Sequence, residues 1–409
     1  MLAEGYAFTC IELFVWTFIV IFMKGTSFIH KIMNLMEKRS MYNNSIVESK
    51  ERLIGLDIVR VISCFMILTF HTFHSLSLSY GFLDKYVEQG AIFVSVFFIL
   101  SGFSLYYANY KKNLSQIKEV KLFYKKRFIG ILPAYFIAWI GFYIPSNIYN
   151  ISLHDIIRLF PIDFLGLRCE LQFLPGMNYF WYISCLIIGY LVYPLINEII
   201  KQIKIKEIVA LIVFIYGIIC YSKYCEDYFG IGSVIYYTPF YRILEMFIGA
   251  FSCQIMFKIK DSHSKPKLMN KIRLIILITS IVGFVYFYKF FLAYGDKWLW
   301  YDIFIIPCTI GILANIDCIK ISSNCLRNVI CFFSGISYEI YLFQTWAIKF
   351  LPKIDLYCQI LNPKMRRAIA LLSIIILSWL INRLIRLLNK LMKRCWLWGA
   401  KVASVALHR

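Results

Sequence analysis

Apolar runs of roughly 18 or more residues recur along nearly the whole chain, separated by short polar loops. A helix needs about 20 such residues to cross a bilayer. The pattern therefore predicts an all-α, polytopic membrane protein with about ten transmembrane helices. We expect these spans at about 57–78, 88–108, 128–148, 178–200, 207–221, 236–257, 273–293, 300–316, 329–350 and 366–388.

The chain divides into three parts on this pattern. Residues 1–52 form a lead-in, in which the apolar stretch 8–25 is an extra N-terminal span, a signal-like segment or a product of upstream translation. No small-residue cleavage site follows that stretch, which argues against a removed signal peptide. Residues 53–390 form the membrane domain, and 391–409 a short basic cytoplasmic tail.

The composition supports the membrane class, because 60% of the residues are hydrophobic and only 16% are charged. The 44 Lys and Arg against 23 Asp and Glu give a net charge of +21. Loops 111–127, 201–207 and 258–273 are rich in these cations and alternate with less basic loops. Because cytoplasmic loops carry such an excess, we expect the start of the main domain and the C-terminus in the cytoplasm of a multi-pass cell (inner) membrane protein. No basic helix lies outside the predicted spans, so nucleic acid is not an expected partner.

Thirteen cysteines occur without a C-x-x-C or a Cys/His cluster, so no metal site is predicted. Cys169, Cys225 and Cys358 fall in predicted outer loops, where a disulfide could form. The longest outer connection, 149–177, contains apolar residues and prolines, and we expect an amphipathic or re-entrant segment over the outer mouth.

The first span of the main domain, "GLDIVRVISCFMILTFHTFHS" (55–75), carries unusual ionisable residues. Arg60 and His71 are eleven residues apart, which on a helix is about 20° past three turns and about 16 Å along the axis. They therefore share one face, with Asp57 near it and His74 about 60° away.

Ionisable groups inside a membrane are costly, which makes them functional candidates. The structural alternative is that Arg60 pairs with Asp57 or reaches the membrane surface, while His71 and His74 hydrogen-bond to neighbouring helices. Arginine grips phosphate and histidine can act as a general base near neutral pH. A coenzyme A thioester fits this layout, because its phosphates and its reactive end are joined by a long arm.

The stretch "LDIVRVISCFMILTFH" (56–71) resembles the first membrane helix of the acyltransferase-3 family, in which ten residues separate an Arg from a His. Further blocks that resemble the family follow in its order, over about 50–390: "FFILSGFSLYY" (97–107), "KRFIGILPAYF" (126–136), "FWYISCLIIGYLVYPLI" (180–196), "YRILEMFIGAF" (241–251) and "GISYEIYLFQ" (335–344). Two positions depart from the family pattern: Gly130 replaces a frequent second Arg, and Gln344 replaces a common His.

The resemblance implies transfer of an acyl group, commonly acetyl, from cytoplasmic acyl-CoA to a hydroxyl of a surface polysaccharide or lipid-linked glycan. Acyl-CoA would be a co-substrate, and no cofactor would be bound permanently. The implied catalytic residues are His71, Arg60 and Asp57. His71 would act as the base or carry the acyl group, and Asp57 would orient Arg60. Arg60 would also hold CoA phosphates together with Lys125, Lys126 and Arg127.

Other polar residues in the spans are candidates for the substrate cavity, although packing and pairing explain several of them equally well. Arg242 and Glu245 are three residues apart on one span, which favours a structural ion pair. The candidates are His74, Ser101, Arg242, Glu245, Tyr338, Glu339 and Gln344.

Two alternatives to an enzyme remain open. A transporter or flippase for a lipid-linked sugar would also use intramembrane Arg, Asp and His, but no inverted repeat is visible in the sequence. An inactive subunit of a polysaccharide-synthesis complex would account for Gly130 and Gln344.

Overall fold

The structure is a computed structural model that describes residues 52–143, 181–229, 237, 239–260, 266–291 and 298–406. Within these ranges the regular elements are all helical. The predicted N-terminal span at 8–25 and the predicted outer connection at 149–177 lie outside the described residues.

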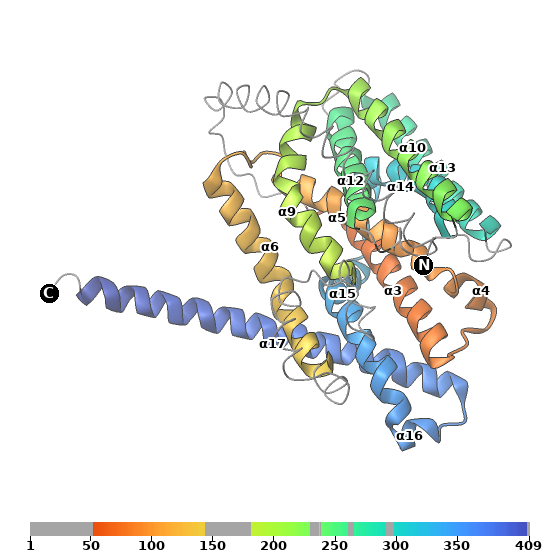
Figure 1. The fold of residues 1–409 in the computed structure, drawn as a ribbon, viewed down its shortest axis with the longest axis vertical. Coiled ribbons are helices and arrows are strands. Elements are labelled where there is room, and N and C mark those ends of the chain that lie inside the picture. The colour runs from red at the N-terminus through yellow and green to blue at the C-terminus, as the bar shows by residue number, and fades with distance from the viewer. Residues whose placement is uncertain are drawn as a thin grey trace.

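The longer helices follow the order of the apolar runs (Figure 1). They are α3 (Ile54–Leu76), α5 (Phe93–Asn109), α6 (Ile117–Ala138), α9 (Trp181–Gln202), α10 (Ile205–Phe229), α12 (Pro239–Lys260), α13 (Pro266–Phe291), α14 (Trp298–Ala314), α15 (Asn324–Phe350) and α17 (Pro363–Ala406). Short helical turns connect some of them: η1 (Gly81–Leu83), α4 (Asp84–Val87), η2 (Gly90–Ile92), the π-helical η3 (Trp139–Tyr143), η5 (Ile316–Cys318), η6 (Leu351–Lys353) and α16 (Asp355–Cys358).

Each of the ten predicted spans falls largely on one of these helices wherever the structure describes it. By length and composition, six are able to cross a membrane: Ile54–Leu76, Gly90–Asn109, Trp181–Gln202, Pro239–Lys260, Leu268–Phe290 and Pro363–Lys390. The spans on α6, α10, α14 and α15 stay predictions. The first half of α6 is strongly cationic, and the apolar part of α14, Phe304–Ala314, is too short to cross a bilayer alone.

Helix α17 continues beyond the last predicted span and ends at Ala406. Most of the predicted tail at 391–409 is therefore part of this helix, which projects away from the rest of the molecule (Figure 1).

Helices α5 and α12 form the centre of the molecule and approach each other through two glycines. A Cβ atom added to Gly249 would lie 1.7 Å from the carbonyl oxygen of Ile99. One added to Gly102 would lie 1.9 Å from the carbonyl oxygen of Met246. Only glycine permits this contact between backbones, which is how helices associate closely where lipid removes the hydrophobic driving force.

Helices α3 and α15 lie side by side and run in the same direction. Ser334 of α15 donates a hydrogen bond to Asp57 near the start of α3 (2.5 Å). Two turns further along α3, the Cys64 thiol donates to the carbonyl of Ser337 (3.6 Å). These two contacts, and the packing of Phe65 against Phe333 with ring centroids 5.2 Å apart, hold the two helices together.

We predict that Gly249→Ala or Gly102→Ala severely destabilises the protein, because the new methyl group would collide with backbone rather than with a movable side chain. The expected loss is about 3 kcal/mol or more, the upper end for an overpacked core. The measurement is the thermal unfolding midpoint of purified protein in detergent. Gly217→Ala in α10 is the matched control, since nothing lies within 4 Å of its added Cβ. Equal midpoints for the three variants would contradict the proposed contact.

Candidate functional site

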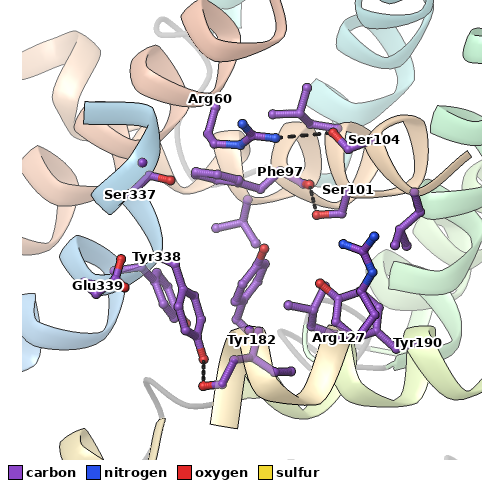
Figure 2. A pocket seen from close by; sticks show the side chains of 18 of the residues that line it. Arg60, Phe97, Ser101, Ser104, Arg127, Tyr182, Tyr190, Ser337, Tyr338 and Glu339 are labelled. Atoms are coloured by element: carbon purple, nitrogen blue, oxygen red, sulfur yellow. Dashed lines mark hydrogen bonds between the residues drawn. The ribbon is translucent and has the colours of Figure 1, made fainter. Parts of the chain in front are cut away.

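A cavity of about 390 Å³ lies between α3, α5, α6, α9, α15 and α17. Its polar lining consists chiefly of Arg60, Ser101, Ser104, Lys126, Arg127 and Glu339. Figure 2 shows the guanidinium groups of Arg60 and Arg127 reaching into one space from different helices, with Ser101 and Ser104 nearby. Residues from six helices far apart in the sequence therefore build one partly charged chamber.

Arg60 is held in place by three neighbours. Its Nη1 donates to the Asp57 carboxylate (3.2 Å) and to Ser334 (3.0 Å), and its Nη2 donates to Ser104 (3.3 Å). The Arg60 side chain remains 28% exposed, so the guanidinium is fixed but still open to the cavity. The hydrogen bonds therefore hold the planar guanidinium of Arg60 in a fixed orientation at the wall of the cavity.

The Asp57 carboxylate is buried and accepts several hydrogen bonds. Besides those from Arg60 and Ser334, it accepts one from Nε of Arg52 at 2.6 Å. The hydrogen bond and charge of Asp57 raise the pKa of Arg52, which lies outside the membrane-spanning part of α3. A buried carboxylate persists only when it is paired and hydrogen-bonded in this way.

The α6 segment contributes two further cations to the cavity. Lys126 and Arg127 line it, whereas Lys125 is exposed and does not. Arg127 stacks over the ring of Phe123 (5.6 Å), and its buried Nε has no hydrogen-bond partner among the described residues. Gly130 also lines the cavity, and an added Cβ would meet nothing within 4 Å. Its lack of a side chain leaves this wall open.

The charge of the described lining is positive, because one carboxylate faces three cations. That carboxylate, Glu339, is buried and accepts a hydrogen bond from Nδ2 of Asn382 on α17 (2.7 Å). An anionic ligand therefore suits the cavity better than a cationic one.

Aromatic side chains form the remaining wall (Figure 2). The rings of Tyr182 and Tyr341 lie 4.9 Å apart, and the Tyr338 hydroxyl donates to the carbonyl of Ile131 (3.1 Å). This wall joins the cationic end of the cavity to its apolar side, which suits a ligand that carries an anionic group on a long neutral arm.

His71 lies just beyond the cavity rather than in its lining. Ile67 lines the cavity, and His71 follows one turn later on the same side of α3, about 6 Å along the axis. His71 is half-buried, whereas His74 is exposed, and both imidazole rings contact Phe70, with centroids 5.2 and 4.6 Å away. The structure thus brings Arg60 into the cavity, puts His71 next to its end and leaves His74 outside.

Gln344 lies in the core, seven residues after Ser337 on α15. Gln344 is 1% exposed, and neither its amide nitrogen nor its carbonyl oxygen has a hydrogen-bond partner among the described residues. A buried amide that lacks partners is costly, so it is a strong candidate to bind a polar group that enters from elsewhere.

Arg242 and Glu245 form an ion pair that does not line the cavity. Both side chains are fully buried, and Nη1 of Arg242 donates to Glu245 (2.7 Å) and to Ser95 on α5 (3.0 Å). The guanidinium also lies over the rings of Phe98 and Trp181, each 5.4 Å away. These contacts assign the pair to the α5–α12 core.

Several polar groups at this site were not predicted from the sequence. Ser104 and Ser334 hold Arg60, and Asn382 holds Glu339. A signal existed for Ser104, since it follows Ser101 by three residues and so lies near its helix face. Ser334 and Asn382 offered none, because serine and asparagine are common in helices and their value here depends on tertiary contact.

A family model described as "Acyltransferase domain" matches residues 53–383 of the chain. This range contains every residue that lines the cavity, and most of the chain. The protein therefore belongs to the acyltransferase-3 family of membrane acyltransferases. No curated protein and no solved structure matches the chain significantly.

We predict that Arg242→Met and Glu245→Leu each cost about 3–5 kcal/mol of stability, because each leaves an unpaired charge in the core. The double variant should lose less than the sum of the two, since neither charge then remains. A double-mutant cycle on thermal unfolding in detergent measures this coupling. Additive losses would show that the pair does not stabilise the fold as a unit.

Proposed function

We propose that the protein is an integral-membrane O-acyltransferase of the cell membrane. It moves an acyl group, in the simplest case acetyl, from cytoplasmic acyl-CoA to a hydroxyl of a surface polysaccharide or lipid-linked glycan. The observation that carries the proposal is the fixed Arg60 guanidinium in a cationic cavity that is also lined by Ile67, one helical turn before His71.

The donor binds through its phosphates in this proposal. Arg60, Lys126 and Arg127 supply the positive charge, and the rigid fork of an arginine matches phosphate oxygens well. The pantetheine arm runs along the tyrosine wall, which places the thioester towards Ile67 and His71. The separation of about 16 Å between Arg60 and His71 along α3 leaves room for such an arm.

The acyl transfer then takes place at His71. The imidazole takes the proton from the acceptor hydroxyl while the hydroxyl oxygen forms a bond to the thioester carbonyl carbon. The carbon–sulfur bond breaks, and the proton passes to the departing thiolate. The Gln344 amide does not titrate near neutral pH and therefore cannot act as an acid or base. Its role in this proposal is to hydrogen-bond the acceptor or the imidazole of His71.

The topology follows the charge of the loops. The basic loops and both ends of the main domain face the cytoplasm, which puts the start of α3 and Arg60 on the side that supplies acyl-CoA. The acceptor approaches His71 from the other side, so the membrane domain itself bridges donor and acceptor.

The test supplies radiolabelled acetyl-CoA to membranes that contain the protein and follows label into extractable glycan. We expect transfer by the wild type and loss of at least about 100-fold in His71→Ala, the lower range for removing a general base. His74→Ala is the control, since its exposed side chain lies outside the cavity. Transfer by His71→Ala at the wild-type rate and equal protein level would refute this mechanism. Movement of a glycan lipid without acyl-CoA would instead establish a transporter.

A second prediction compares the contributions of Lys125 and Lys126, two adjacent lysines, to the binding of acyl-CoA. Lys126→Ala should raise the apparent KM for acyl-CoA about two- to five-fold, as expected for one exposed charge contact. Lys125→Ala should leave it unchanged, because Lys125 does not line the cavity. Initial rates across acyl-CoA concentrations measure both. Equal effects of the two substitutions would show that general surface charge, and not the cavity, binds the donor.

A further inference from the structure

A second cavity, of about 520 Å³, lies where α3 begins, between the end of α12, the first turns of α13 and the segment that leads into α15. It shares no lining residue with the cavity around Arg60. Its volume falls in the range of roughly 300–1,000 Å³ that is common for small-molecule sites. Nothing in the proposed acyl transfer makes use of it.

The lining of this second cavity is strongly cationic. Five cationic side chains from four separate segments converge on it: Arg52, Lys260, Arg273, Lys320 and Arg327. Among the described residues, Asp317 is the one carboxylate that lines it. Such an excess of one charge in a confined space favours an anion.

The one carboxylate is already occupied by two of the cations. Lys260 lies 3.0 Å from one oxygen of Asp317, and the buried Arg273 donates to the other. Arg273 also donates to the side-chain oxygen of Asn315 at 3.2 Å. These contacts fix one side of the cavity as a rigid structural unit.

The charges of the other lining cations are not balanced in this way. Lys320 and Arg327 are exposed and form no ion pair with a described residue. Arg52 is paired with Asp57, which lies outside the cavity lining. The lining therefore combines an ion-paired cluster around Asp317 with two exposed cations that have no carboxylate partner among the described residues.

Apolar side chains complete the lining, among them Ile54, Ile259 and Ile319. A simple inorganic anion would leave this surface unused. A phosphate attached to an apolar group would use both the cations and the apolar floor, and basic pockets between membrane helices commonly receive phosphorylated head groups in this way.

We propose that this second cavity binds the phosphate of an amphiphilic ligand, independently of acyl transfer. Two sources share this chemistry: the head group of an anionic phospholipid and a free phosphorylated nucleoside. Arg327 and Lys320 bind the phosphate from the exposed side, and Arg273 provides a fixed charge from the core.

The test compares Lys320→Ala/Arg327→Ala with Lys204→Ala/Lys206→Ala. Both pairs remove two exposed charges from predicted cytoplasmic loops or helix starts, but Lys204 and Lys206 lie outside both cavities. The lipid arm measures retention of phosphatidylglycerol from mixed micelles by native mass spectrometry. The nucleotide arm titrates adenosine 3′,5′-bisphosphate, and a third arm titrates inorganic phosphate, each by thermal shift in neutral detergent.

We expect one amphiphilic ligand to bind the wild type and the control alike, and to bind Lys320→Ala/Arg327→Ala about five- to ten-fold more weakly. If phosphatidylglycerol shows this difference, the ligand is a phospholipid; if adenosine 3′,5′-bisphosphate shows it, the ligand is a phosphorylated nucleoside. Equal weakening of both double variants, unchanged binding by Lys320→Ala/Arg327→Ala, or binding of inorganic phosphate alone would overturn the proposal. Nucleotide binding that is lost only in Lys126→Ala/Arg127→Ala would assign the nucleotide to the first cavity and overturn that source. Because each readout is binding, the outcome does not depend on whether the protein transfers an acyl group.

Discussion

The backbone contact between α5 and α12 at Gly102 and Gly249 is the constraint on which the rest of the structure depends. Lipid does not drive apolar helices together, so close packing must supply the attraction, and glycine allows the closest packing. The same two helices are joined by the buried Arg242–Glu245 pair and its hydrogen bond to Ser95. Because α5 also carries Ser101 and Ser104, the wall that contacts Arg60 from this side belongs to the closely packed α5–α12 pair.

The cost of charge in a low-dielectric interior explains the arrangement of the polar residues. Asp57 is buried and satisfied by three donors, and this leaves Arg60 restrained by neighbours yet partly exposed. The buried carboxylate of Glu339 likewise accepts a hydrogen bond from Asn382. Gln344 is the exception, because the described residues offer its amide no partner. A buried amide without partners is unusual in a folded protein and marks this part of the core as a candidate for binding a polar group.

Much of the fold and part of the site could be predicted from the sequence. Apolar runs located the helices, and the spacing of Arg60 and His71 gave a shared face, because both depend on local periodicity. The contrast between Lys125 and Lys126 could not be predicted, since adjacent helix positions differ by about 100° and the rotation of α6 is set by its neighbours. For the same reason the sequence could not place His71 beyond the cavity or Arg242 in the core. The second cavity is still less visible in the sequence, because its cations come from segments that are separated along the chain by up to about 270 residues.

Helix α6 lies at the edge of the bundle and, within the described residues, has small interfaces with α9, α15 and α17 (Figure 1). It nevertheless supplies two of the three cations of the first cavity. An anion held between Arg60 and Arg127 would therefore act as a tertiary contact, linking this peripheral helix to the packed core. By mass action such a ligand stabilises the assembled state in proportion to its occupancy. The stability of the attachment of α6 to the bundle would then depend on the concentration of that anion.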